Sequence, residues 1–183
     1  MSIITSLFSH TKKHRIEAVL APHLDDLLRQ AQRYTYSSTA AEDLFQDLCV
    51  YVCQREETLL SLDPVKPWLM KCLYHRFVDN YRKQQRRVDE VSFEPEHENI
   101  NAAQDDTQIH EYREQLRLAM AHLSAAQRGV ITLFDIEGYS LAEIADVLEL
   151  SESTIKSHLH RGRKKLKELV KVQPLVNSQR LTL

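Results

Sequence analysis

The sequence predicts an all-α protein built from two small helical domains joined by an acidic, flexible linker. Only three Gly and five Pro occur among 183 residues, which leaves little material for the tight turns of β-hairpins. Several segments begin with a hydroxyl residue followed three positions later by Glu, Gln or Thr, the pattern of a helix N-terminus. An apolar content of 43% with 27% charged residues excludes a collagen-like chain and a wholly disordered one.

Charge divides the chain into domains and a linker. Residues 66–87 contain seven Lys and Arg against one acid, and residues 156–171 show the same balance. Between these basic segments, residues 88–111 contain eight acids and neither Lys nor Arg. The acidic segment lacks helical periodicity and includes Pro95, so we expect a solvated linker. The predicted organisation is a first domain over residues 1–87, a linker over 88–108, a second domain over 109–172 and a tail over 173–183.

Start and stop signals set the limits of the expected helices. Hydroxyl caps stand at Thr39, Ser124, Ser140 and Ser151. Gly138 is suited to end a helix, because glycine adopts the left-handed conformation of a C-cap without strain. In chain order we expect helices over residues 39–54, 65–86, 124–138, 140–148 and 151–170, preceded by an N-terminal helix pair bent or broken at Pro22.

The last expected helix has one apolar face and one basic face. At about 100° per residue, its buried stripe comprises Ile155, Leu159, Gly162, Leu166 and Leu169. The opposite face carries hydroxyls, an imidazole and cations, from Ser153, Lys156, Ser157, His160, Arg161 and Lys164. With the short helix and three-residue turn before it, this helix completes a helix-turn-helix whose basic face can enter the DNA major groove. A solvated basic helix in an ordinary α-bundle is the alternative that this segment alone leaves open.

The expected helix over residues 65–86 also differs between its two sides. Its core face comprises Leu69, Met70, Leu73, Phe77, Val78 and Tyr81. The other side carries Trp68, Lys71, Cys72, His75, Asp79, Arg82 and Arg86. An aromatic ring among cations is what stacking of unpaired bases requires. Packing of Trp68 beneath the preceding loop, with the cations merely solvated, is the open alternative.

The expected helix over residues 39–54 presents a different outer face. This face is acidic with one apolar residue near its middle, and comprises Asp43, Gln46, Asp47, Val50 and Gln54. It would repel phosphates, which argues against a nucleic-acid surface. The pattern indicates a docking surface for a basic region of a protein partner, and the alternative is an acidic face that serves only solubility.

Composition argues against several other classes of protein. The formal net charge of −2 argues against coating of nucleic acid by bulk charge. No apolar run approaches the roughly 18 residues of a membrane span. The N-terminal segment lacks the basic-then-apolar order of a secretory signal. We therefore expect a cytoplasmic protein without membrane insertion.

The cysteines and histidines form no pattern of a chemical site. Cys49, Cys53 and Cys72 contain no CxxC pair, which suits reduced thiols better than disulfides or a closed metal site. A histidine-rich hydrolase is disfavoured, because His158 and His160 would point roughly 160° apart on one helix. We expect no catalytic residue, metal, cofactor or small-molecule substrate.

The sequence resembles the sigma-70 family of bacterial RNA polymerase specificity subunits, in its small two-domain extracytoplasmic-function (ECF) group. Region 2.2 of the family is similar to AAEDLFQDLCVYV, and regions 2.3 and 2.4 are similar to PWLMKCLYHRFVDNYRKQQRR. Region 4 is similar to LSAAQRGVITLFDIEGYSLAEIADVLELSESTIKSHLHRGRKKLKEL. These stretches cover most of residues 24–170 and imply a region 2-like bundle and a region 4-like helix-turn-helix.

The resemblance implies a role for each exposed face in promoter-specific transcription initiation. It implies docking on the clamp helices of the largest subunit of core RNA polymerase through Asp43, Gln46, Asp47 and Val50. It implies recognition and melting of the promoter −10 element by Trp68, Lys71, His75, Asp79, Asn80, Arg82 and Arg86. It implies recognition of the −35 element by Ser153, Lys156, Ser157, His160, Arg161 and Lys164. A linker threaded through the polymerase and an anti-sigma factor partner are further implications.

Four residues depart from the family pattern. Ala40 stands where an acid is frequent and His75 where Asn is frequent. Glu149 occupies a turn position that is usually Gly, and Gly162 a position that is usually Ala. None of these changes breaks the expected fold.

The competing function is a stand-alone helix-turn-helix regulator that binds double-stranded operators as a dimer. It explains residues 140–167 but leaves the acidic helix and the helix of Trp68 without a role. Tight specific binding to a duplex without polymerase would favour this alternative.

Overall fold

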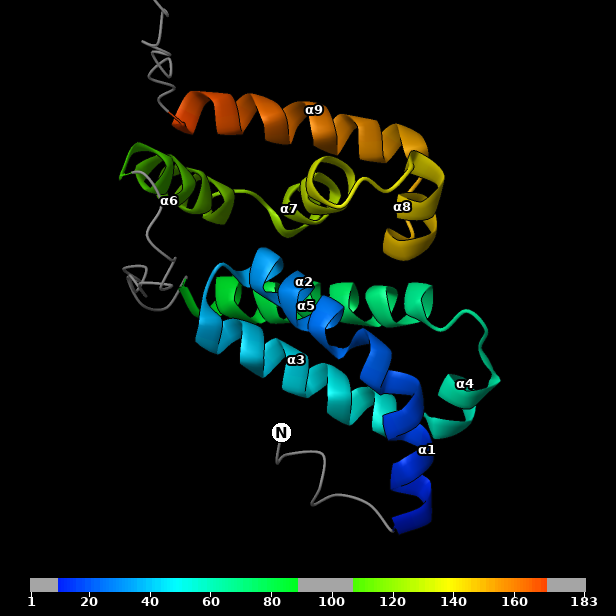
Figure 1. The fold of residues 1–183 in the computed structure, drawn as a ribbon. Helices are drawn as coiled ribbons and strands as arrows, with labels where there is room; N and C mark the ends of the chain where they lie inside the picture. Colours follow the sequence, from blue (N-terminus) through cyan, green and yellow to red (C-terminus); the bar gives the residue numbers. More distant parts are fainter. Residues whose placement is uncertain (1–9, 89–106, 171–183) are drawn as a thin grey trace, which may run out of the picture.

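Helices account for all regular structure in the part of the chain that the structure describes. The computed structural model describes residues 10–88 and 107–170 (Figure 1). The first domain comprises α1 (His10–Leu20), the 3-10 turn η2 (Ala21–His23), α2 (Leu24–Thr35), α3 (Ser38–Cys53), α4 (Glu56–Ser61) and α5 (Lys66–Val88). The second comprises α6 (Thr107–Ala121), α7 (Ala125–Ile131), the π-helical turn η3 (Thr132–Ile136), α8 (Leu141–Leu148) and α9 (Glu152–Leu169). The predicted all-α, two-domain fold is confirmed, whereas residues 89–106 and the predicted tail lie outside the described residues.

The first domain is organised around α2, α3 and α5, with α1 and α4 at one end (Figure 1). Their inner faces carry fully buried side chains, among them Leu27, Tyr34, Leu44, Leu48, Leu69 and Leu73. The rings of Tyr34 and Phe77 stack with centroids 5.0 Å apart. Pro22 lies within η2, where it separates α1 from α2 as the sequence predicts.

Local capping fixes the helix starts of the second domain. Ser124 forms a capping box with Gln127, and Ser140 forms one with Glu143. The Ser151 hydroxyl accepts a hydrogen bond from the Thr154 backbone N–H at 3.3 Å. These three predicted caps are confirmed, because each depends only on residues within one turn of helix.

The cap of α3 differs from the prediction. The helix begins at Ser38, one residue before the expected range. Its cap is Ser37, two residues before the predicted Thr39, and the Ser37 hydroxyl accepts from the Ala40 backbone N–H. Tyr36 ends α2 in the left-handed conformation at φ 56°, and Ser37 follows in an extended conformation. The short connection places the first hydroxyl of the Ser37–Thr39 run at the cap, so Thr39 is already inside the helix.

The expected helix over residues 124–138 is also divided. Regular α-helix ends at Ile131 and continues as the π-helical turn η3 to Ile136. Gly138 follows at φ 74°, consistent with its expected role in ending the segment. In addition, α4 and α6 are helices that the start signals did not reveal.

Two side chains lie on a different side of their helix from the one expected. Leu169, placed on the buried stripe of α9, is 42% exposed, because it is the last residue of the helix and Val170 is buried in its place. Cys72, placed on the outward side of α5, is buried in the core. Packing partners cover α5 on more than one side, since both α3 and the second domain contact it.

The two domains pack directly on each other, with α7 and α8 facing α2 and α5 (Figure 1). A continuous cluster of buried side chains extends through both domains. Gly129 of α7 permits the close approach, because a Cβ atom there would lie 2.5 Å from Tyr74 Cε2 of α5. Gly162 has the same effect inside the second domain, where a Cβ atom would lie 2.6 Å from Ile131 Cδ1.

Candidate nucleic-acid and protein interfaces

The face of α9 predicted to enter the major groove is open to solvent. All six predicted residues are exposed, namely Ser153, Lys156, Ser157, His160, Arg161 and Lys164. Ser157 Oγ donates to the Ser153 carbonyl at 2.9 Å, and Arg161 Nε donates to the Ser157 carbonyl at 3.3 Å. These bonds hold the hydroxyl and guanidinium along the helix surface. The arrangement is a basic ridge with its side chains directed away from the core.

Other cations of α9 hold the helix in place. Arg163 donates from Nε to Asp135 Oδ2 of η3 at 3.0 Å, and forms a second bond to the same carboxylate. Lys165 Nζ donates to the His122 carbonyl at 2.6 Å. The buried stripe contributes Ile155 and Leu159 to the core. The opposite ridge is therefore fixed in orientation by contacts on the other sides of the helix.

The residues predicted to bind the −10 element lie along α5 but differ in surroundings. Lys71 and His75 are half-buried and face Glu149 of the second domain, with Lys71 Nζ 2.6 Å from Oε1 and His75 Nε2 3.2 Å from Oε2. Trp68 is half-buried one turn earlier. Asp79, Arg82 and Arg86 are exposed toward the C-terminal end of the helix. The structure thus separates a covered first half of this face from an open second half.

Asn80 differs from the other predicted −10 residues. Its Nδ2 donates to Asp47 Oδ2 of α3 at 3.3 Å. It therefore connects α5 to the predicted polymerase-binding helix. Sequence reasoning had no signal for this contact, because the partners are 33 positions apart.

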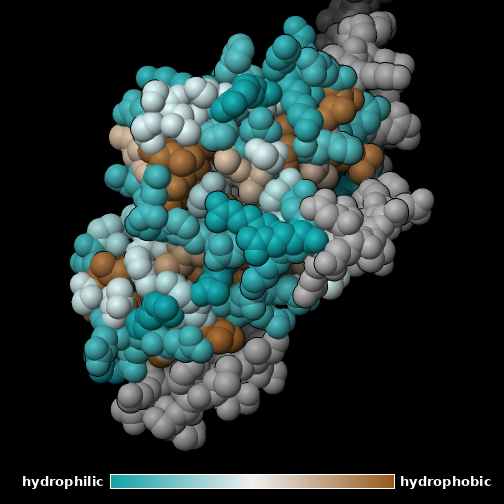
Figure 2. Space-filling view, turned by 180° about the vertical axis from the view of Figure 1, so that it is seen from behind, coloured by the Kyte–Doolittle hydropathy of each residue, from teal (hydrophilic) through white to brown (hydrophobic). Residues whose placement is uncertain are grey.

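The acidic face of α3 is open. Asp43, Gln46, Asp47 and Val50 are all exposed, and Val50 is 44% exposed despite its apolar side chain. A single exposed apolar side chain is common on protein surfaces, so the distinguishing feature of this face is its acidic charge. From behind, the described surface is mostly hydrophilic with small scattered apolar patches (Figure 2).

The contact between the domains centres on Arg128, which sequence reasoning missed. Its side chain is buried, and Nη1 donates to the Tyr34 carbonyl at 2.7 Å while Nη2 donates to the Ala121 carbonyl at 2.8 Å. The guanidinium carbon lies 5.5 Å from the Phe77 ring centroid. Burial lowers the pKa of Arg128 below its usual range. The sequence around Arg128, AAQRGVI, carries no local signal of this contact, because its partner on α2 is 94 positions away.

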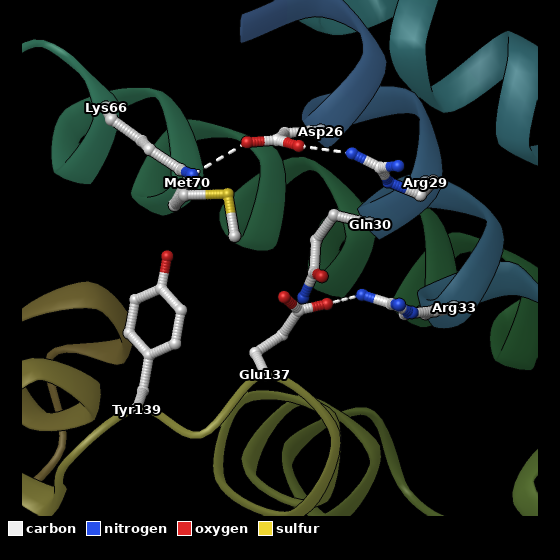
Figure 3. A pocket seen from close by; sticks show the side chains of 8 residues that line it. All are labelled: Asp26, Arg29, Gln30, Arg33, Lys66, Met70, Glu137 and Tyr139. Carbon is white, nitrogen blue, oxygen red and sulfur yellow. Dashed lines mark hydrogen bonds and ion pairs between the residues drawn. The ribbon is translucent and has the colours of Figure 1, made fainter.

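Arg117 and Arg33 add polar contacts to the same boundary. Arg117 Nη1 donates to the Tyr36 carbonyl at 2.9 Å, so two arginines of the second domain bind the C-terminal end of α2. A cation is favoured there by the helix dipole. Arg33 of α2 pairs with Glu137, which follows η3 (Figure 3).

A polar cavity lies where α2 and α5 meet the segment between η3 and α8 (Figure 3). Its three cations already have acidic partners. Arg33 pairs with Glu137, while Lys66 and Arg29 both pair with Asp26, at 2.7 Å and 2.5 Å. These pairs satisfy the charges that an anionic ligand would need, so the cavity is part of the domain boundary.

All three cysteines are free thiols that are buried or half-buried. Burial raises the pKa of the Cys49 and Cys72 thiols to about 11, which disfavours the reactive thiolate. Within residues 10–88 and 107–170, no three His, Cys, Asp or Glu side chains gather to hold a metal ion. None of the described helices combines the length and apolar character needed to cross a membrane.

The described residues form a helical bundle with an acidic outer helix, packed against a helix-turn-helix whose last helix has a basic face, an arrangement typical of DNA-binding transcription proteins. The first part of the chain matches the family model "Sigma-70 region 2" over residues 19–87, and the second matches "Sigma-70, region 4" over residues 113–166. The chain belongs to the sigma-70 family of RNA polymerase sigma factors.

Similar proteins come from several bacteria. The chain is 32% identical over 133 residues to the ECF RNA polymerase sigma factor SigX of Bacillus subtilis, covering 69% of each chain. It is 31% identical over 153 residues to SigL of Mycobacterium tuberculosis, covering 79% of this chain and 82% of that protein. Among solved structures, sigma factor RpoE of Bartonella quintana in complex with anti-sigma factor NepR matches with a TM-score of 0.67 and 29% identity, over 87% of this chain and 98% of that one.

Proposed function

We propose that the chain is an ECF-type sigma factor that directs promoter-specific transcription initiation by binding core RNA polymerase and the −10 and −35 promoter elements. The observation that carries the proposal is the division of exposed chemistry among three helices of one family fold: acidic α3, mixed aromatic and basic α5, and basic α9. Each face suits a different partner. Covalent chemistry belongs to the polymerase in this proposal, and the chain contributes recognition.

At the −35 element, α9 is proposed to lie in the major groove. Ser153 is near the helix N-terminus, where the backbone dipole favours a DNA phosphate. Lys156 and Lys164 supply further charge for phosphates, and Arg161 supplies the planar donor fork that suits guanine. His160 and Ser157 complete the same exposed ridge. The support is that these side chains share one solvent-facing side of a firmly anchored helix.

At the −10 element, α5 is proposed to hold unpaired bases. Trp68 offers a stacking surface, which contributes roughly 1–3 kcal/mol per base in such complexes. Lys71 and His75 lie on the same helix within two turns of it. Arg82 and Arg86 extend a basic track for the strand backbone. Asp79 is exposed beside this track, and Asn80 connects α5 to α3 through its hydrogen bond to Asp47.

To bind polymerase, α3 is proposed to dock on the clamp helices of the largest subunit of core RNA polymerase. Asp43 and Asp47 give the charge, Gln46 a hydrogen-bonding group and Val50 an apolar contact. Complementary charge accelerates encounter and fixes orientation, while the apolar contact slows dissociation.

The remaining parts follow the same proposal. The acidic linker is proposed to comprise residues 89–106, because Val88 belongs to α5 and Thr107 to α6; a fully extended chain of this length would span roughly 60 Å at about 3.5 Å per residue. An anti-sigma factor is a proposed regulator, supported by the match to a sigma factor held in an anti-sigma complex. The cytoplasm is the proposed location, because the partners are polymerase and DNA.

A stand-alone operator-binding regulator is not favoured, since it gives α3 no partner.

The test is transcription in vitro with purified core polymerase. Templates carry the region upstream of the chain's own operon, and a housekeeping sigma factor serves as the positive control. In reactions without the housekeeping factor, we expect defined transcripts only when the full chain and core polymerase are combined. The proposal would be contradicted if the housekeeping factor with core polymerase gave transcripts, the chain with core polymerase gave none, and the free chain bound duplex DNA tightly.

A further inference from the structure

Two arginines lie against one tyrosine ring where α3 and α5 pack side by side. The guanidinium carbon of Arg55 is 3.6 Å from the Tyr51 ring centroid, and that of Arg76 is 4.0 Å from the same centroid. Arg55 lies between α3 and α4, whereas Arg76 lies within α5. Arg55 Nη1 also donates to the Tyr51 carbonyl at 3.3 Å. Together, Tyr51, Arg55 and Arg76 form the Tyr51 cluster.

The Tyr51 cluster carries positive charge that no described carboxylate neutralises. In residues 10–88 and 107–170, the ion pairs join other cations to acids, and neither Arg55 nor Arg76 takes part in one. Arg55 is exposed and Arg76 is half-buried. A guanidinium that stacks on an aromatic ring still presents N–H donors at its edge, which suit the oxygens of a phosphate. The cluster therefore has the charge and the donors of an anion-binding site.

The cluster borders the proposed stacking surface of Trp68. Trp68, Cys72 and Arg76 follow one another at intervals of four residues on α5, so they are neighbours along one side of the helix. Burial raises the pKa of the Cys72 thiol to about 11, and the nearby charges of Arg55, Arg76 and Lys71 oppose that rise. Both arginines thus lie close to Cys72, which is one helical turn from Trp68.

The charges on either side of Trp68 favour one path for a DNA strand. If the bases of an unpaired strand stack on α5, its phosphates have to run along one flank of that helix. On one flank, the carboxylate of Glu149 lies 2.6 Å from Lys71 Nζ and 3.2 Å from His75 Nε2, where it would repel phosphates. On the flank next to α3, the Tyr51 cluster offers two cations without acidic partners among the described residues.

We propose that Arg55 and Arg76 bind backbone phosphates of the unpaired promoter strand whose bases stack on α5, and that Tyr51 holds both guanidiniums in position. The inference rests on the proposed function and adds the flank of α5 along which the strand backbone runs. Tyr51 is a positioning residue, because it acts through the two arginines. Contacts to phosphates fix the strand in place without reading its sequence.

The first experiment measures how salt affects binding of DNA by the holoenzyme of full chain and core polymerase. The probe is a short duplex from upstream of the chain's own operon, with its −10 region held open by mismatches and no −35 element. Each phosphate contact to a single strand contributes about 0.7 to the slope of log affinity against log salt concentration. Arg55→Ala and Arg76→Ala should each reduce the slope by about 0.7 and weaken binding to all −10 sequences alike.

A matched control removes the same charge elsewhere. Lys167 is exposed in the last turn of α9, and a probe without the −35 element gives that helix no site. Lys167→Ala should therefore leave the affinity and the slope unchanged. If Lys167→Ala and the two arginine variants reduced the slope equally, total charge would explain the effect and the proposal would be overturned.

Tyr51 variants separate the ring from the hydroxyl. Tyr51→Phe keeps the ring against both guanidiniums, so DNA affinity and salt slope should match the wild type. Tyr51→Ala frees both arginines, so DNA affinity should fall at least about fivefold while affinity for core polymerase is retained. Circular dichroism checks that each variant is folded. Equal DNA binding by the Phe and Ala variants would contradict the positioning role of Tyr51.

The second experiment locates the phosphates. Methylphosphonate linkages, which lack the negative charge, replace single phosphates along the unpaired strand of the same probe. With wild-type holoenzyme, the most sensitive positions should lose about tenfold or more in affinity. With Arg76→Ala, at least one of these penalties should disappear, because the cation that met that phosphate is gone. Penalties that are the same in wild type, Arg55→Ala and Arg76→Ala would overturn the proposal.

The remaining outcomes distinguish this inference from the proposed function. Arg55→Ala and Arg76→Ala that weaken binding to core polymerase, with the DNA salt slope intact, would assign the cluster to a carboxylate of the polymerase and overturn the inference. Wild-type holoenzyme that binds the probe as well as both variants do would contradict the inference alone. A wild-type chain that confers no binding to the probe on core polymerase would contradict the proposed function, and the inference with it.

Discussion

At the residue scale, Arg128 joins the two domains, and its hydrogen-bond partners among the described residues are carbonyl oxygens, with no carboxylate. Its guanidinium donates to carbonyl oxygens of Tyr34, Ala121 and, at 3.4 Å, Leu123. Burial lowers the pKa of Arg128, but the guanidinium is so strong a base that it retains its charge. The carbonyl of Tyr34 lies in the last turn of α2, where helix oxygens lack backbone partners. One side chain therefore caps a helix and fixes the position of the other domain.

Replacing Arg128 by Ala should lower the free energy of unfolding by about 2–4 kcal/mol, because buried carbonyl oxygens lose their donors and a cavity opens. Urea denaturation followed by circular dichroism measures the change. Arg128→Lys should recover only part of it, since an ammonium cannot reproduce the fork. Arg29→Ala, at an exposed ion pair, is the control and should change stability by less than about 0.5 kcal/mol. A similarly small effect at Arg128 would contradict the assigned role.

Replacing Arg161 by Ala should weaken recognition of the −35 element by about 1–3 kcal/mol if the guanidinium contacts a base. The side chain is exposed, so helicity and polymerase binding should be unchanged. The measurement is holoenzyme binding to promoter variants that differ only in that element. Arg86→Ala, the matched control in the first domain, should leave preference among those variants intact. Equal losses for the two substitutions would argue against separate roles for α9 and α5.

At the element scale, helix ends that are set by neighbouring residues could be predicted from the sequence, whereas helix ends that are set by tertiary packing could not. The boxes at Ser124 and Ser140 close within four residues, so the sequence contains all their information. The start of α3 depends instead on how α2 ends, because Tyr36 takes the left-handed conformation and leaves Ser37 extended. The same holds for η3, where α7 gives way to a π-helical turn before Gly138. Tertiary packing selected these ends from several local possibilities.

Replacing Ser140 by Ala should destabilise α8 by about 1 kcal/mol at pH 7, because the cap accepts from the Glu143 backbone N–H. Hydrogen bonds from the Ser140 hydroxyl and then from its backbone N–H lower the Glu143 pKa below its ordinary 4.5. A lowered folded pKa means that this stabilisation is present above about pH 4.5 and is lost as the pH falls through the folded value.

The difference between wild type and Ser140→Ala should therefore shrink between pH 7 and pH 3. Urea denaturation at both values measures it. Ser61→Ala is the control, because its hydroxyl donates to the Thr58 carbonyl at the end of α4 and forms no capping box. A difference that grows toward low pH would show that the sign of the Glu143 contribution is wrong.

At the scale of the whole molecule, the net charge of −2 is a cancellation between basic helices and acidic segments. Helix faces could be assigned from the sequence, because periodicity fixes which side chains share a side. The contact between domains could not, because Arg128 and its Tyr34 partner are 94 positions apart and neither has a local signature. Glu149 was visible only as a departure from glycine, and its partners on α5 emerged from the structure.

Reversing the charge of Asp47 tests the division of labour across the whole chain. Asp47→Lys should weaken binding to core polymerase by at least about tenfold, because a cation would face the basic partner surface that the acidic α3 indicates. The side chain is exposed, so helicity should be retained apart from the lost contact with Asn80. Fluorescence titration with labelled protein measures the affinity, and Glu57→Lys on exposed α4 is the matched reversal that should bind normally. Equal weakening by both substitutions would indicate that total charge, and not the α3 face, governs assembly with the polymerase.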